Sequence, residues 1–166
     1  MRARGDWSRA IVETWLRQPA AVRACLPLTT MALLWWSSSR TPTVLEPSQL
    51  RAVLHNGMHV VAYAALAGSW LLALVRGDDP HRRLTKAVVA SFLLSVAYGA
   101  VDELHQSFVP GRDCSISDWM TDGAGSALAL MVLRWHLGVG TVSWPHLALL
   151  VATCLACVAF ATWGPW

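Results

Sequence analysis

Charged residues are scarce in this chain, and their scarcity excludes an ordinary water-soluble domain. Asp, Glu, Lys and Arg make up 14% of the 166 residues, whereas hydrophobic residues make up 55%. A soluble globular domain averages about 25% charged residues. The mean hydropathy of +0.42 is typical of a chain that lies in a membrane. The length suits one domain, so the composition predicts a single membrane domain.

Signals of several other protein classes are also missing. Two His and several carboxylates could serve zinc or manganese, but no HExxH or comparable ligand spacing occurs, so no metal or other cofactor is predicted. The basic residues flank apolar segments and form no patch, which argues against a nucleic-acid partner. Cys154 and Cys157 form a CxxC inside an apolar segment. Zinc and redox chemistry need a polar, accessible setting, so we expect these thiols to pack.

The amino-terminal residues lack the uninterrupted apolar core of a secretory signal peptide. Trp7, Ile11 and Trp15 recur at four-residue spacing, which fits an amphipathic helix on the membrane surface. A disordered basic leader explains the same residues equally well. We expect residues 1–19 to be a cytoplasmic basic leader, which can form an amphipathic helix. Residues 20–166 are expected to be the transmembrane domain.

Five segments are candidates to cross the membrane as helices, each of which needs about 20 mostly apolar residues. Their approximate ranges are Ala20–Ser38, Met58–Val75, Leu84–Val101, Trp119–Trp135 and Pro145–Trp163. Several of the ten Trp residues fall near the ends of these segments, where the indole ring favours the membrane interface. The sequence therefore predicts an all-α fold, an integral membrane bundle of about five transmembrane helices.

Positive charge predicts the orientation of this bundle. Ten of the thirteen Lys and Arg residues lie before or just inside the first segment, between the second segment and the first turn of the third, or at the end of the fourth. The remaining loops hold Arg40, Arg51 and Arg112. Lys and Arg concentrate in cytoplasmic loops. We therefore expect the amino terminus inside and the carboxyl terminus outside.

This orientation brings polar residues from three helices to one depth, near the outer interface. They lie at the start of the second segment, at the end of the third and at the start of the fourth. Charged groups within a membrane are costly and commonly functional. We predict one outward-facing polar site with these ligand-binding residues: His59, Tyr63, Asp102, Glu103, His105, Gln106, Arg112, Asp118 and Asp122.

Helical spacing suggests catalytic candidates within this set. Asp102, His105 and Gln106 share one helix face through i,i+3 and i,i+4 spacing. An Asp one turn before a His can orient the imidazole for acid–base chemistry. Asp102, His105 and His59 are therefore the catalytic candidates. The same residues can instead neutralise one another at a helix end, which is a purely structural role.

Arg112 and the two later Asp residues also allow two interpretations. Arg112 follows the Pro110-Gly111 turn signal, and its guanidinium can bind phosphate or carboxylate through two hydrogen bonds. It can equally form an ion pair with a nearby acid. Asp118 suits the first turn of a helix, whereas Asp122, one turn deeper, is explained less well by capping. The acids that could form the ion pair with Arg112 are Asp102, Glu103 and Asp118.

The residues of this site form a long and specific string. It reads DE-x-HQ-x-F-x-P-x-R over residues 102–112, with Asp118 and Gly125 after it and His59 and Tyr63 before it. The chain here resembles the VanZ-like membrane protein family, over residues 55–125. The resemblance implies a bacterial inner-membrane protein of the cell envelope. The family's namesake is linked to resistance to the glycopeptide antibiotic teicoplanin, but the resemblance implies no particular reaction.

Two departures from the family's usual pattern affect the site. The family usually has an Asp-Lys pair where this chain has His55-Asn56, and usually has Asn where this chain has Asp122. The first departure removes a charge pair. The second adds a carboxylate, which would alter the charge preference for a ligand.

Three functions of different classes follow from these observations. The first is an envelope protein whose outer site binds a lipid-linked or amphiphilic ligand, such as a lipoglycopeptide, with membrane lipids as partners. The second is an integral-membrane enzyme that hydrolyses or transfers a group on an outer-leaflet lipid headgroup, with His105 as base or nucleophile and Arg112 stabilising the developing anion. The third is a transporter. It is favoured less, because five spans are few for a transporter and the sequence shows no repeated pair of broken helices.

Overall fold

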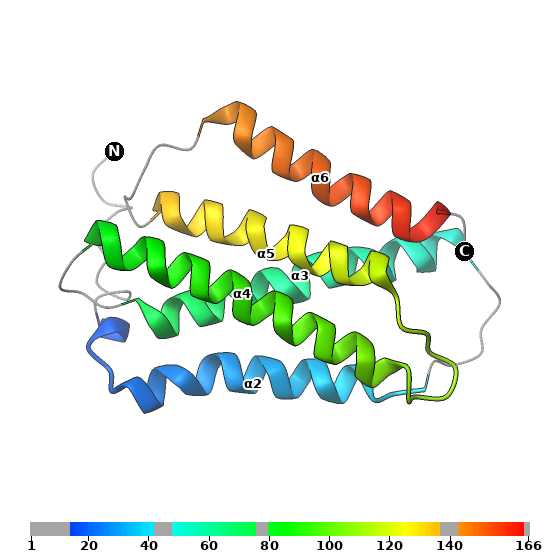
Figure 1. Ribbon diagram of the computed structural model, residues 1–166, viewed down its shortest axis with the longest axis horizontal. Helices are drawn as coiled ribbons and strands as arrows, with labels where there is room; N and C mark the ends of the chain where they lie inside the picture. Colours follow the sequence, from blue (N-terminus) through cyan, green and yellow to red (C-terminus); the bar gives the residue numbers. More distant parts are fainter. Residues whose placement is uncertain (1–13, 42–47, 76–79, 137–142, 165–166) are drawn as a thin grey trace.

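The computed structural model describes residues 14–41, 48–75, 80–136 and 143–164. No strand occurs within these ranges, so the all-α prediction is confirmed. Its long helices, drawn in Figure 1, are α2 (Ala20–Ser38), α3 (Gln49–Leu74), α4 (Pro80–Gln106), α5 (Ile116–His136) and α6 (Trp144–Trp163).

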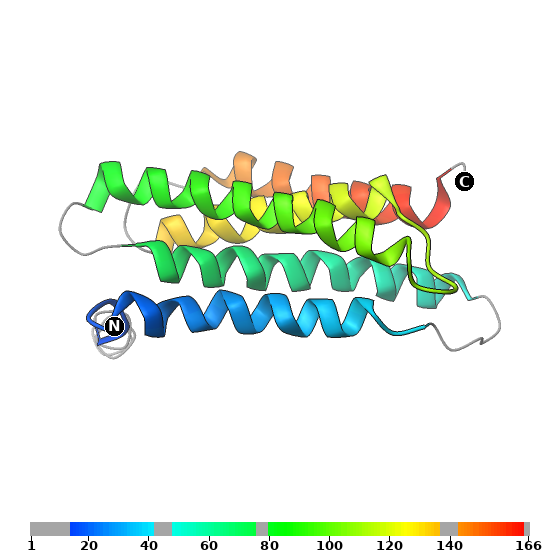
Figure 2. The same ribbon diagram turned by 60° about the horizontal axis from the view of Figure 1, so that its bottom comes forward.

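Consecutive helices run in opposite directions, so α2 begins and α6 ends at opposite ends of the bundle (Figure 1). Helix α3 is central and packs against each of α2, α4, α5 and α6. Figure 2 shows α2 along one side of α3, with α4, α5 and α6 on the other. As a result, the last turns of α2 and α4 and the first turns of α3 and α5 meet at one end.

Three helical segments of the described chain are each long and apolar enough to cross a membrane: Gln49–Leu74, Leu84–Gln106 and Trp144–Trp163. Helix α6 buries only 6% of its apolar window within the bundle. An apolar helix that presents almost all its surface outward suits hydrocarbon and would be costly in water. Helix α5 is less apolar because it buries polar side chains against its neighbours, including Thr121, Asp122 and Ser126.

The helix ends near the polar site differ from those expected. The sequence places the start of the second span at Met58 and the end of the third at Val101, whereas α3 begins at Gln49 and α4 continues to Gln106. The additional turns carry polar residues that are satisfied by neighbouring helices, so polarity there does not end the helix. The first helix has the expected bounds, and α4 ends before Pro110, as the turn signal predicts.

The predicted amphipathic leader lies mostly outside the described residues, which begin at residue 14. Within the described part, the Trp15 indole N–H donates to the Leu72 carbonyl (3.2 Å). Arg23 is buried, and its guanidinium donates to the Val75 carbonyl at the same end of α3. Both contacts tie the amino-terminal side of α2 to the end of α3 that lies away from the polar site.

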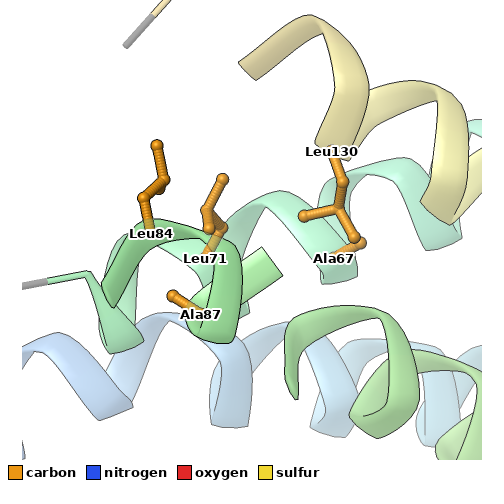
Figure 3. Close-up of a cluster of buried hydrophobic side chains, with 5 residues drawn as sticks. All are labelled: Ala67, Leu71, Leu84, Ala87 and Leu130. Carbon is orange, nitrogen blue, oxygen red and sulfur yellow. The ribbon is translucent and has the colours of Figure 1, made fainter. Parts of the chain in front are cut away.

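The apolar core fills the end of the bundle opposite the polar site. Figure 3 shows its buried cluster, contributed by α3, α4 and α5: Ala67, Leu71, Leu84, Ala87 and Leu130. Nearer the polar end, α3 and α5 approach so closely that a Cβ added at Gly125 would lie 2.4 Å from the Val60 carbonyl oxygen. Small residues allow such backbone contact between membrane helices. This contact sets the separation of the α3 and α5 side chains one turn further out.

Candidate ligand-binding site

Several carboxylates are buried at the polar end of the bundle. Asp102 and Glu103 are each 3% exposed and Asp122 is 0% exposed. Burying a carboxylate costs several kcal/mol unless hydrogen bonds and opposite charge compensate it. The hydrogen bonds around these groups therefore define the site.

Gln106 connects two of the carboxylates to Arg112. Its Nε2 donates to Asp102 Oδ2 (3.2 Å) and to Glu103 Oε1 (3.4 Å). Its Oε1 accepts from Arg112 Nη1 (3.3 Å). Gln106 is itself only 3% exposed, so this amide orients Asp102 and Glu103 away from solvent.

Helix α2 contributes serines that the sequence does not single out. Ser38 Oγ donates to Asp102 Oδ1 (2.6 Å). Ser39 Oγ lies 2.9 Å from His105 Nε2, and the His105 ring stacks on Trp35 with centroids 3.7 Å apart. The predicted topology could have indicated these serines, because the run Ser37-Ser38-Ser39 ends the first helix on the same side of the bundle as the other polar groups.

These contacts separate Asp102 from His105. The hydrogen bonds of Asp102 within the described chain go to Ser38 and Gln106, and the imidazole of His105 pairs with Ser39. The expectation that Asp102 orients His105 is therefore wrong for this structure. Sharing a helix face does not produce the contact, because a neighbouring helix offers each side chain a closer partner.

Arg112 binds only neutral oxygens within the described chain. Its Nε donates to the Arg40 carbonyl (3.0 Å), Nη2 to the Ser37 carbonyl (3.4 Å) and Nη1 to Gln106. No ion pair joins Arg112 to a described carboxylate, so the expected pairing with nearby acids does not form. The guanidinium is held in place while its charge is not neutralised by direct contact.

His59 and Asp122 form an ion pair between α3 and α5. His59 Nδ1 lies 2.9 Å from Asp122 Oδ1, and the His59 side chain is 11% exposed. Asp122 Oδ2 and the Tyr63 hydroxyl are buried without a hydrogen-bond partner among the described residues. A Cβ at Gly99 would lie 3.0 Å from Asp122 Oδ2, so a glycine on α4 makes room for this carboxylate.

Glu103 fixes the start of α5. Its Oε2 accepts from the Ser115 backbone N–H (2.7 Å). Ser115 Oγ in turn accepts from the Asp118 backbone N–H (3.2 Å), which caps the helix. The Asp118 carboxylate is half-buried beside the outer cleft described next.

Two adjoining cavities open at this end of the bundle. The inner cavity, of about 210 Å³, lies between α2, α3 and α4. An outer cleft of about 440 Å³ shares three lining residues with it, namely His55, Gln106 and Arg112. Most residues that line the inner cavity are polar, but the lining includes the apolar side chains of Leu34, Met58 and Ala62. Such a space can hold a charged or polar headgroup beside an apolar chain.

The part of the chain that holds the polar site also matches a known protein family. A family model described as VanZ/LLP1 matches residues 9–137. The chain belongs to the VanZ/LLP1 family. The match spans α2 to α5, and with them the whole polar site, and ends before α6. No curated protein matches the chain, and no solved structure matches it.

His55 and Asn56, which replace the usual Asp-Lys pair of the VanZ-like pattern, lie in different surroundings in this VanZ/LLP1 protein. Asn56 is buried and its Nδ2 donates to Thr162 Oγ1 (3.0 Å), which ties α3 to α6. His55 lines both cavities and lies edge-on to His59, with centroids 5.1 Å apart. His55 lies before the start of the second segment predicted from the sequence, at Met58, but it is part of α3. The four-residue spacing to His59 and Tyr63 could have indicated this.

Most of the predicted site residues gather around the cavities of this VanZ/LLP1 protein. The inner cavity is lined by His59, Tyr63, Asp102, Gln106 and Arg112. Glu103 and Asp122 lie buried behind these residues, and Asp118 lines the outer cleft. His105 lines neither cavity, because its ring is stacked on Trp35.

Proposed function

We propose that this VanZ/LLP1 membrane protein binds the anionic headgroup of a membrane amphiphile in the inner cavity. The observation that carries the proposal is Arg112, which lines both cavities and, among the residues that the structure describes, donates only to neutral oxygens. Arginine beside phosphate or carboxylate forms short, charge-assisted hydrogen bonds. An anionic headgroup supplies the negative charge that the guanidinium does not contact in the described part of the chain.

The proposal includes a place and an orientation in the cell. It locates the protein as a multi-pass protein of the bacterial cytoplasmic membrane, with the amino terminus inside and the carboxyl terminus outside. The distribution of ten of the thirteen Lys and Arg residues supports this orientation. The polar site then faces outward, within reach of outer-leaflet lipids.

The ligand class follows from the polar and apolar residues that line the inner cavity. Met58 and Ala62 of α3 and Leu34 of α2 supply apolar lining to the same cavity that Arg112 lines. Leu54 and Val61 extend exposed apolar surface along α3. A lipid-linked or lipoglycopeptide ligand combines an anionic group with an acyl chain and fits both surfaces. Retention of such a ligand is the link to glycopeptide (teicoplanin) resistance that the family resemblance suggests.

Filling the cavity tests this proposal. Ala62→Trp places an indole in a space of about 210 Å³ and is expected to lower amphiphile affinity at least about tenfold, equivalent to about 1.4 kcal/mol. The protein is reconstituted in nanodiscs, and retained phosphatidic acid is compared with phosphatidylcholine by native mass spectrometry. Ala65→Trp is the matched control, because Ala65 is exposed on the same helix. Equal retention of both lipids by the unmodified protein, or equal loss in both variants, contradicts the proposal.

A second function, an enzyme acting on the headgroup, is favoured by the His59–Asp122 pair. A His held by a buried carboxylate beside a cavity has the arrangement of a general acid–base. His59 lines the inner cavity and His105 does not, so the geometry favours His59 over His105 in this role. Hydrolysis or group transfer on an outer-leaflet lipid headgroup is the reaction class.

Turnover distinguishes this enzyme from a binding protein. Purified protein is incubated with a panel of lipid phosphates and lipid-linked glycans, and products are measured by mass spectrometry. His59→Gln is expected to reduce turnover at least about 100-fold, within the range of acid–base catalysis, whereas His105→Gln retains most of it. Absence of products across the panel, or equal activity in the His59→Gln variant, rejects an enzymatic role for His59.

A further inference from the structure

Three side chains beside the inner cavity come together from three helices: His59 of α3, which lines the cavity, and the buried Glu103 of α4 and Asp122 of α5. One nitrogen or oxygen from each lies within 4.8 Å of the others. Atoms bound to one zinc or manganese ion lie within about 4 Å of one another, since each bond is about 2 Å long. Small side-chain rotations complete that geometry. We infer that these residues form a binding site for a divalent transition-metal ion.

An unpartnered oxygen points to this ligand independently of the spacing. Asp122 is 0% exposed, yet its Oδ2 has no hydrogen-bond partner among the described residues. This oxygen lies against Gly99, one helical turn before Glu103 on α4. A buried carboxylate oxygen without a partner costs free energy. A cation bound between Asp122 and Glu103 satisfies it.

The local charge favours a divalent ion. Asp102, Glu103 and Asp122 are buried carboxylates, and Glu103 lies near both others: it shares the Gln106 amide with Asp102 and belongs to one ligand set with Asp122. His59 is the basic group in direct contact with one of them, and Arg112 donates only to neutral oxygens within the described chain. Buried negative charge without matching positive charge is strongly unfavourable. An ion of charge +2 balances most of it.

The kind of metal follows from the ligands. One imidazole with carboxylates suits zinc, manganese or iron, whereas sites for magnesium and calcium are built from oxygens alone. Glu103 is already oriented by the Ser115 backbone N–H and by Gln106. Metal ligands usually have such outer hydrogen bonds, which hold them in position. No ligand spacing along the sequence indicates this site, because each of the three ligands comes from a different helix.

A second set of ligands lies outside the first and shares His59 with it. His55, His59 and Asp118 also place one ligand atom each within 4.8 Å of the others. His55 and Asp118 line the outer cleft, so they offer an ion its first ligands on the way from solvent to the buried set. The inference concerns metal binding alone and stands whether or not the cavity binds a headgroup.

Metal binding is measured on the full-length, untagged protein in detergent after treatment with a chelator. Co²⁺ is added and its visible absorption recorded, and Zn²⁺ is then used to displace it. We expect one saturable Co²⁺ per chain, with histidine nitrogen coupling detectable by electron paramagnetic resonance. Asp122→Asn and His59→Gln are each expected to weaken Co²⁺ binding at least about tenfold.

Matched variants separate a specific site from general charge effects. Asp113→Asn removes an exposed carboxylate at the same end, and His136→Gln removes an exposed imidazole at the other end of α5. Neither belongs to a ligand set, and both are expected to bind Co²⁺ as the unmodified protein does. No saturable Co²⁺ or Zn²⁺ binding, or equal weakening in the controls, overturns the inference. If the Asp122 and His59 variants do not fold, the stoichiometry and nitrogen coupling of the unmodified protein decide.

Discussion

Replacing Arg112 with alanine is expected to lower the affinity for an anionic amphiphile about 10- to 100-fold, because hydrogen bonds to a charged group contribute about 1.5–3 kcal/mol. The guanidinium lines both cavities and is positioned by the carbonyls of Ser37 and Arg40 and by Gln106. The affinity for phosphatidic acid is measured in nanodiscs by native mass spectrometry, with phosphatidylcholine as the neutral reference. Binding of phosphatidylcholine is expected to change little.

Two further variants sharpen this result. Arg112→Lys keeps the charge but loses the planar fork, so it is expected to recover only part of the affinity. Arg40→Ala removes an equal charge at the same end of the bundle, where the guanidinium lies 3.7 Å over the Trp36 ring. The Arg40 backbone carbonyl that accepts from Arg112 is unchanged by that substitution. If both alanine variants lose affinity equally, the effect comes from general surface charge and Arg112 is not the headgroup ligand.

Gly125→Ala is expected to produce the largest loss of stability. The added Cβ would lie 2.4 Å from the Val60 carbonyl oxygen, 2.8 Å from its Cα and 3.0 Å from its carbonyl carbon. These are backbone atoms that cannot rotate away, so α3 and α5 must separate. Overpacking a core costs about 1–3 kcal/mol and occasionally more, and we expect the upper part of this range. Thermal unfolding in detergent, followed by circular dichroism, measures the change.

Gly123→Ala is the control for this substitution on the same helix. The nearest atom to a Cβ at Gly123 is Val96 Cγ2 at 3.9 Å, an ordinary van der Waals distance. Alanine has a higher helix propensity than glycine by about 1 kcal/mol, so this variant is expected to be unchanged or slightly more stable. If Gly125→Ala unfolds at the same temperature as Gly123→Ala, α3 and α5 do not depend on close backbone contact.

The sequence predicts that polar residues of three helices come together, and the structure brings them to one end of the bundle. Charge distribution places the polar ends of three helices at one depth, and the structure brings His59 and Asp122 into contact there. The pairing of Asp102 could not be predicted in this way. Its partner Ser38 comes from α2, and the rotation of α2 about its axis depends on packing that helical periodicity does not encode.

The same limit explains the different placement of His105. Periodicity puts Asp102 and His105 on one face, but the ring of His105 turns to Trp35 because that aromatic side chain lies on the neighbouring helix. The set of His59, Glu103 and Asp122 is likewise invisible to a search for ligand spacing along the chain. It forms because Gly99 and Gly125 let three helices approach closely.

The glycine contact between α3 and α5 has a mechanical consequence. It joins the two helices through their backbones, so His59 and Asp122 sit on a stiff unit whose spacing resists change. Helix α2, by contrast, is held at this end through side chains, including Ser38 on Asp102 and Tyr98 on the Met31 carbonyl. If the inner cavity widens for a bulky molecule, we therefore expect α2 to move and α3 and α5 to keep their spacing.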